Sequence, residues 1–270
     1  MQSKANERLA ERVEQVLAHM HERLGRKASP ALADFVRRFF ARVAPEDVLS
    51  QSVEGLYGAV VSLWKFAEMR PKGAPGIRAF NPRTEQDGWS SAHTVIQLVN
   101  DDMPFLVDTV AMTLAGLGHG VHLLIHPIVN ISRDADGRRR EAGGEQAGAA
   151  KPESLMHVEI GELTNADALG EIEAKLQAAL ADVRDSVADW RAMLARLRDT
   201  IGDLQRNPPP VESDEASEAI ALLEWMGADN FTFLGYREYD YGDDAEMMRI
   251  VADTGLGILR NPGRRVMVGV

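Results

Sequence analysis

The spacing of apolar residues over the first 70 positions predicts three amphipathic helices. Between residues 6 and 24, apolar residues recur every three or four positions, which places them on one helical face, and Gly25 ends the helix. Ser29 and Pro30 are typical of a second helix start, because serine caps a first turn and proline needs no N–H there. A third helix is predicted to begin at Pro45. These residues indicate a helical lobe.

A segment rich in proline and glycine follows at residues 71–82. The third helix must stop before Pro71, because the residue preceding a proline resists helical geometry. We expect a linker here, with one short extended segment at Ile77–Phe80. The sequence thus predicts a helical leader and linker at residues 1–82.

The pattern changes at residue 93, where the apolar spacing becomes typical of strands alternating with helices. Residues 93–100 are apolar on both faces, as in a strand that is covered on both sides. A helix at 104–117, a strand at 121–133, a flexible loop at 137–154, a strand at 154–163 and a helix starting near Thr164 or Asn165 complete the order β-α-β-β-α. We expect a helix-covered sheet in residues 83–207.

Three consecutive prolines, Pro208–Pro210, end this region. A further helix at 216–226 and a hairpin around Gly242-Asp243 indicate the start of another α/β region at 208–270. The overall class is therefore α+β. Because little chain remains to complete that region, we expect the native protein to continue beyond Val270.

Composition narrows the functional classes. Acidic residues exceed basic ones by 41 to 30, and the net charge of −11 argues against nucleic acid or an anionic membrane as a partner. The absence of cysteine excludes disulfides and a thiol nucleophile, and it agrees with a cytoplasmic location. The N-terminus has charges where a signal peptide needs an apolar stretch, and no apolar run is long enough to span a membrane.

The turn after the strand at 93–100 is the main candidate for a ligand site. It consists of Asn100, Asp101, Asp102, Met103, Pro104 and Phe105. Free N–H groups at a helix start favour a carboxylate, while the Asn and Asp side chains can accept hydrogen bonds from an amino group. A free amino acid supplies both groups. The alternative is that Asp102 only caps the helix at Pro104.

Four histidines offer nitrogen ligands for a metal, with Asp101 and Asp102 nearby in the sequence. They are His119, His122, His126 and His157. Their spacing matches no known metal motif, which favours structural roles. We predict no metal site.

A glycine-rich turn at 255–257 invites comparison with dinucleotide-binding loops. Arg260 stands where the third glycine of that fingerprint should be. We predict no cofactor bound by this chain.

Several long stretches, in the same order, resemble the N-terminal region of the large bacterial NAD-dependent glutamate dehydrogenases. They are VNDDMPFLVDTVAMTL, GVHLLIHPIVNISRDADG and ESLMHVEIGEL, with LYGAVVSLWKFAEMRP before them and LLEWMGADNFTFLGYREYDY and GLGILR after them. The resemblance covers essentially the whole chain. It implies a ferredoxin-like, ACT-type βαββα(β) domain with an antiparallel sheet covered by helices.

The resemblance also implies a function. ACT-like modules come first in that family, and the NAD-binding core that converts L-glutamate to 2-oxoglutarate lies beyond this chain's end, so we expect no catalytic residues here. ACT domains commonly pair side by side and bind small molecules, often amino acids, at the turn that maps to 100–105. Many ligand-binding ACT domains have Asp-x-Pro-Gly there, whereas Phe105 replaces the glycine, which favours packing.

Three alternatives remain open at this point. The chain could be a purely structural module for contacts between copies in a homo-oligomer, or a free-standing ACT-type amino-acid sensor. A remote third reading is a metal-dependent hydrolase that uses the histidines.

Overall fold

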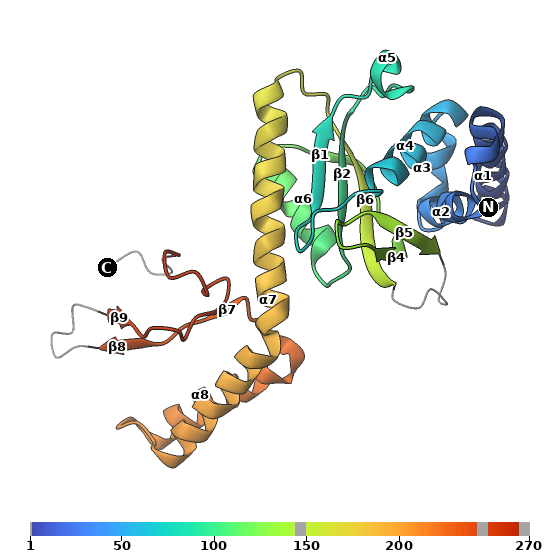
Figure 1. Ribbon diagram of the computed structural model, residues 1–270. Helices are drawn as coiled ribbons and strands as arrows, with labels where there is room; N and C mark the ends of the chain where they lie inside the picture. Colours follow the sequence, from blue (N-terminus) through green and yellow to red (C-terminus); the bar gives the residue numbers. More distant parts are fainter. Residues whose placement is uncertain (1, 144–149, 242–247, 265–270) are drawn as a thin grey trace. The chain divides into compact units, whose positions relative to one another are not determined.

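The computed structural model describes residues 2–143, 150–241 and 248–264, and it confirms the α+β class (Figure 1). The chain forms two compact units, Met1–Leu180 and Ala181–Val270. The predicted domain boundaries after residues 82 and 207 stay predictions.

The helical lobe comprises α1 (Gln2–Leu24), α2 (Pro30–Phe40), α3 (Pro45–Leu49) and α4 (Val53–Phe66), with a short 3-10 turn at Gly25–Lys27. The predicted cap of α2 is confirmed, since the Ser29 hydroxyl accepts a 3.2 Å hydrogen bond from the Leu32 N–H. The prediction of a single helix from Pro45 is wrong, because the segment forms two helices, α3 and α4. Ser52 caps the second of them by accepting a 3.1 Å hydrogen bond from the Gly55 N–H.

One antiparallel sheet forms the centre of the first unit. Its strands are β1 (Gly76–Phe80), β2 (Thr94–Asp101), β3 (Val121–Ile125), β4 (Ile128–Arg133), β5 (Arg139–Gly143) and β6 (Lys151–Ile160). They follow the order β1-β2-β6-β4-β5, and β3 also pairs with β6. A short helix, α5 (Thr84–Asp87), separates β1 from β2, and α6 (Leu106–Gly116) follows β2.

The short extended segment predicted at Ile77–Phe80 is confirmed as β1, which pairs with β2 along its full length. Two other expectations about this sheet need correction. The strand predicted at 121–133 is two strands, because Pro127 between them has no N–H to donate and its carbonyl accepts from the Leu155 N–H. Part of the loop predicted at 137–154 is β5 and the start of β6, while residues 144–149 lie outside the described residues.

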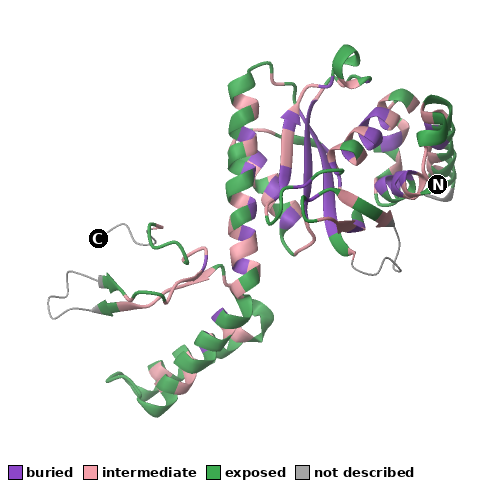
Figure 2. Ribbon diagram, viewed as in Figure 1, coloured by how far each residue is buried: buried purple, intermediate pink, exposed green. Residues whose placement is uncertain are grey.

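Helices cover both faces of the sheet (Figure 1). Alternate residues of β2 explain this arrangement, because their side chains point to opposite faces. Val95 and Val99 pack in one core with the helical lobe. Ile96 and Leu98 are buried as well, on the face where α6 and the first part of α7 lie. Figure 2 shows this burial, with the central strands largely purple and purple also on the helices that flank the sheet.

The long helix α7 (Ala166–Arg206) begins where predicted, with the Asn165 side chain accepting a hydrogen bond from the Asp167 N–H. The second unit contains the later part of α7, α8 (Ser213–Trp225), a π-helical turn (Met226–Asn230) and strands β7 (Gly235–Tyr236), β8 (Tyr239–Tyr241), β9 (Met248–Ile250) and β10 (Leu256–Gly257). Strands β8 and β9 pair as the expected hairpin, whose turn at Gly242-Asp243 lies outside the described residues. None of the described helices is long and apolar enough to cross a membrane.

Candidate functional site

The turn between β2 and α6 holds the six residues predicted as a ligand site. Asn100 is buried near the end of β2, Met103 is half-buried and Pro104 is exposed. Asp101, the last residue of β2, accepts a 2.7 Å hydrogen bond from the guanidinium of Arg70. The strand therefore delivers one buried amide and one ion-paired carboxylate to this end of the sheet.

Asp102 does not cap the helix, which corrects one of the two readings of this residue. Its N–H donates to the Pro152 carbonyl, and its side chain accepts a 2.5 Å hydrogen bond from the Ser154 hydroxyl. That hydroxyl lies 2.9 Å from His126 Nε2. Because the single hydroxyl proton goes to Asp102, the imidazole must donate, which places its proton on Nε2. Burial lowers the pKa of His126, the Asp102 charge opposes this shift, and Arg42 adds to it.

Phe105 is the N-cap of α6, which begins at Leu106 and not at Pro104 as predicted. Its φ angle is 70°, in the left-handed region where a residue without a Cβ has no steric cost. About half of the Phe105 residue surface, 48%, is exposed. The backbone thus retains the turn for which glycine is suited, while the side chain stands at the surface.

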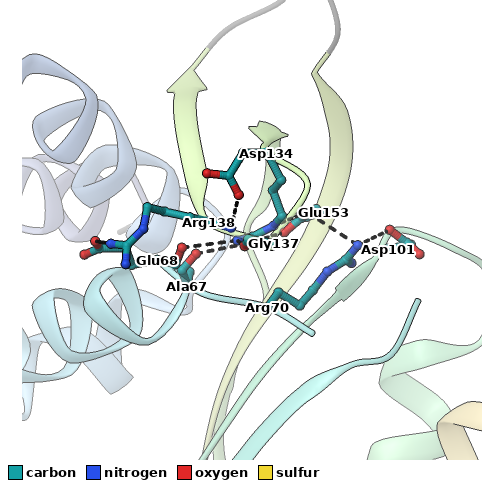
Figure 3. Close-up of polar contacts among 9 residues, drawn as sticks. Ala67, Glu68, Arg70, Asp101, Asp134, Gly137, Arg138 and Glu153 are labelled. Atoms are coloured by element: carbon teal, nitrogen blue, oxygen red, sulfur yellow. Dashed lines mark hydrogen bonds and ion pairs between the residues drawn. The ribbon is translucent and has the colours of Figure 1, made fainter. Parts of the chain in front are cut away.

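A network of charges connects this turn to the helical lobe (Figure 3). Arg70 also lies 3.7 Å from Glu153, a buried carboxylate on β6. Glu153 in turn accepts two hydrogen bonds, of 2.7 and 2.8 Å, from Arg133. Arg133 further donates to the carbonyl groups of Ala67 and Gly137. The segment after α4, the β4–β5 hairpin and the end of β2 are therefore held together by buried polar contacts.

The sequence also matches a known protein family. Residues 35–176 match the family model described as "Glutamate dehydrogenase, ACT1 domain". This chain belongs to that family.

Relatives of the ACT1 segment are similar along nearly all of the chain. The "NAD-specific glutamate dehydrogenase" of Halomonas elongata is 36% identical over 253 residues, and that of Pseudomonas aeruginosa is 33% identical over 250 residues. These matches cover 92% and 91% of this chain but only 16% and 15% of the relatives. A protein of the same name from Mycobacterium tuberculosis is 28% identical over 168 residues. The chain is thus similar to an N-terminal region of this family.

The histidines of the ACT1 domain do not gather as one group. His122 lies near Glu159, and His157 Nε2 lies 3.2 Å from Glu159 Oε1. His126 instead lies beside the Asn100–Phe105 turn, where it contacts Ser154. His119 follows α6. Among the described residues, no three or more His, Cys, Asp or Glu side chains are arranged to hold a metal ion.

Glu159 is a buried carboxylate on β6 with a histidine close to each of its two oxygens. Its second oxygen, Oε2, lies 3.2 Å from His93 Nδ1. Burial raises the pKa of Glu159, but the hydrogen bond from His157 and the nearby His93 and His122 outweigh burial, and the net pKa is lowered. The surrounding histidines thus favour the ionised form of Glu159.

The glycine-rich turn at 255–257 lies in the second unit. The Gly257 N–H donates a 2.8 Å hydrogen bond to Asp189, and Arg260 donates 2.6 Å hydrogen bonds to both oxygens of the same carboxylate. A protein carboxylate thus occupies the donors that a phosphate would need.

Sequence reasoning missed Arg70, Ser154, Glu153, His93 and Glu159. One signal was available, because β6 carries Glu153, His157 and Glu159 on one face of a strand whose residues 153–160 are all buried. A polar residue at a position covered by protein must find a partner. The identity of that partner depends on which strands and helices pack together. The local sequence pattern does not contain this information.

Proposed function

We propose that this chain is the non-catalytic regulatory and oligomerisation region of a cytoplasmic NAD-dependent glutamate dehydrogenase. The reaction of the whole enzyme would be the oxidation of L-glutamate by NAD to 2-oxoglutarate and ammonium. NAD would bind outside this chain, and the turn at 100–105 would receive an effector such as an amino acid.

The ion pair between Arg70 and Asp101 carries this proposal. A ligand that binds beside Asp101 changes the charge next to Arg70, whose side chain is only 10% exposed. Since Arg70 also faces Glu153, the change reaches Arg133 and the carbonyl groups at the end of the helical lobe. Partly buried ion pairs are screened less by solvent than exposed ones, so such a disturbance is felt along the network.

A purely structural role is the second candidate, and Asp102 favours it. Both its N–H and its carboxylate already have partners within the domain, namely Pro152 and Ser154. In that case the ACT1 domain contributes contacts between copies of the chain in a homo-oligomer and binds no effector.

Kinetics of the full-length enzyme distinguish the two roles. With regulation, Asp101→Asn changes the KM for glutamate or the effector response, while Glu162→Gln, on an exposed residue after β6, does not. If both variants match the parent in kinetics but Asp101→Asn changes the sedimentation coefficient, the structural role is supported.

The isolated chain gives a simpler test of its non-catalytic nature. Purified protein incubated with glutamate and NAD is expected to form no NADH. NADH formation by these residues alone would contradict the proposal. A free-standing amino-acid sensor would share the binding behaviour but would have no dehydrogenase to respond, and a metal-dependent hydrolase would contain stoichiometric metal by elemental analysis.

A further inference from the structure

A cavity of about 410 Å³ lies where the α3–α4 turn faces the sheet, at the opposite end of β2 from the Asn100–Phe105 turn. The eight residues of β2 separate the two places by roughly 25 Å. One wall contains Asp47 and Ser52, and the other contains Ser91, His93 and Glu159. The volume is within the range of small-molecule sites, which is about 300 to 1,000 Å³.

Glu159 in this cavity wall is linked to Arg78 by a series of hydrogen bonds through Gln97 and His157. Arg78 donates to Gln97 Oε1 at 2.6 and 3.0 Å, so the amide nitrogen of Gln97 is the atom that faces His157 Nδ1, at 3.4 Å. His157 must then carry its proton on Nε2, from which it donates to Glu159. These hydrogen bonds orient His157 so that its Nε2 side faces Glu159.

No lysine or arginine pairs with Glu159 in the part of the chain that the structure describes. Its second oxygen lies 3.2 Å from His93 Nδ1, and the His93 side chain is 38% exposed and lines the same cavity. A buried carboxylate with no permanent cation is costly, which makes an ammonium group a favourable occupant. Asp47, on the opposite wall, adds a second negative charge.

The same cavity contains hydrogen-bond donors for an anionic group. Ser52 and Ser91 accept hydrogen bonds from the N–H groups of Gly55 and His93, which leaves their hydroxyl protons available for other acceptors. Trp89 also lines the cavity and is 8% exposed.

We infer that this cavity is a binding site for a small zwitterion, a molecule that carries an ammonium and a carboxylate on the same or adjacent carbons. The ammonium faces Glu159 and the carboxylate accepts from the serine hydroxyls. This site is separate from the turn at 100–105. Binding to it is measured on the chain itself, so the result does not depend on whether the regulatory proposal is correct.

Isothermal titration of the chain with glycine, L-alanine, L-aspartate and L-arginine tests the inference. Acetate and methylammonium, which carry one charged group each, are the matched half-ligands. At least one amino acid should bind, and both half-ligands should bind at least about tenfold more weakly, because each loses a charge-assisted hydrogen bond. Failure of all four amino acids to bind at about 10 mM, where a Kd of about 1 mM is readily measured, would overturn it.

Variants place the bound molecule. Glu159→Gln and Ser91→Ala should each weaken binding at least about tenfold, with His93→Gln as a substitute if Glu159→Gln fails to fold. Glu162→Gln, on an exposed residue after β6, should leave the affinity unchanged. Binding that survives Glu159→Gln in folded protein but is lost in Asp102→Asn would place the ligand at the β2–α6 turn and overturn the assignment.

Discussion

Arg70 donates a 2.7 Å hydrogen bond to Asp101, although the arginine side chain is 10% exposed and the aspartate side chain 41% exposed. The two residues are 31 positions apart, and their contact joins the exit of α4 to the end of β2. The Glu153 side chain is only 3% exposed, and it forms ion pairs with both Arg70 and Arg133. The contributions of the two carboxylates to stability should therefore differ.

Glu153→Gln is expected to lower the free energy of unfolding by about 3 kcal/mol, because it leaves two guanidinium groups in the interior with too little negative charge. Asp101→Asn should cost about 1 kcal/mol or less, because water screens a partly exposed carboxylate. Urea unfolding at neutral pH measures both values. Equal losses in the two variants would contradict the role given to Glu153.

Phe105→Gly should be more stable than Phe105→Ala by about 1 kcal/mol, because the φ angle of 70° is free of steric cost only for glycine. Both variants remove the aromatic ring, so their difference isolates the backbone. Thermal unfolding of the pair measures it. If alanine proves as stable as glycine, the left-handed conformation at this position is not the source of strain.

Gly137→Ala should destabilise the protein by about 3 kcal/mol, because its φ is positive and a Cβ would collide with the Arg70 carbonyl oxygen. Gly118→Ala is the matched control, since its φ is similar but no atom lies within 4 Å of the added Cβ. That variant should lose only about 1 kcal/mol. Similar losses in chemical denaturation would show that contact with Arg70 is unimportant.

The pH dependence of stability should contain a contribution from His126. Burial lowers its pKa below the ordinary 6.5, so the unfolded chain binds the proton more readily than the folded one. The contribution is fully present above about pH 6.5, and stability falls as the pH drops below that value. His126→Gln should flatten this part of the profile. An unchanged slope in urea titrations between about pH 7 and pH 5.5 would argue against it.

Much of the fold could be predicted because it depends on local patterns. Ser29 and Asn165 are residue types that are common at helix starts. The apolar runs of β2 and β6 are typical of strands covered on both faces. The errors also have local causes. Ser52 restarts a helix, and Pro127 interrupts a strand, within segments whose apolar spacing is continuous.

The candidate sites depend on contacts that no local pattern specifies. The pairing of Arg70 with Asp101 requires that the chain leaving α4 crosses the end of β2. The position of His93 beside Glu159 requires the antiparallel register of β2 with β6, which sets Val95 opposite Glu159. Aspartate favours helix caps, which is why the sequence offers Asp102 as a cap for α6. Instead, the Ser154 hydroxyl on β6 donates a hydrogen bond to its carboxylate.

The edge strand β1 has a consequence for how copies of this chain can associate. The Ala79 N–H donates a 2.7 Å hydrogen bond to the carboxylate of Glu173 on α7. An approaching strand would have to break that bond before it could add to the sheet, and charged side chains at edges discourage such growth. Helices already cover both faces, so β1 is a poor template for fibril-like stacking. Self-association at this edge therefore requires surfaces other than the backbone of the strand.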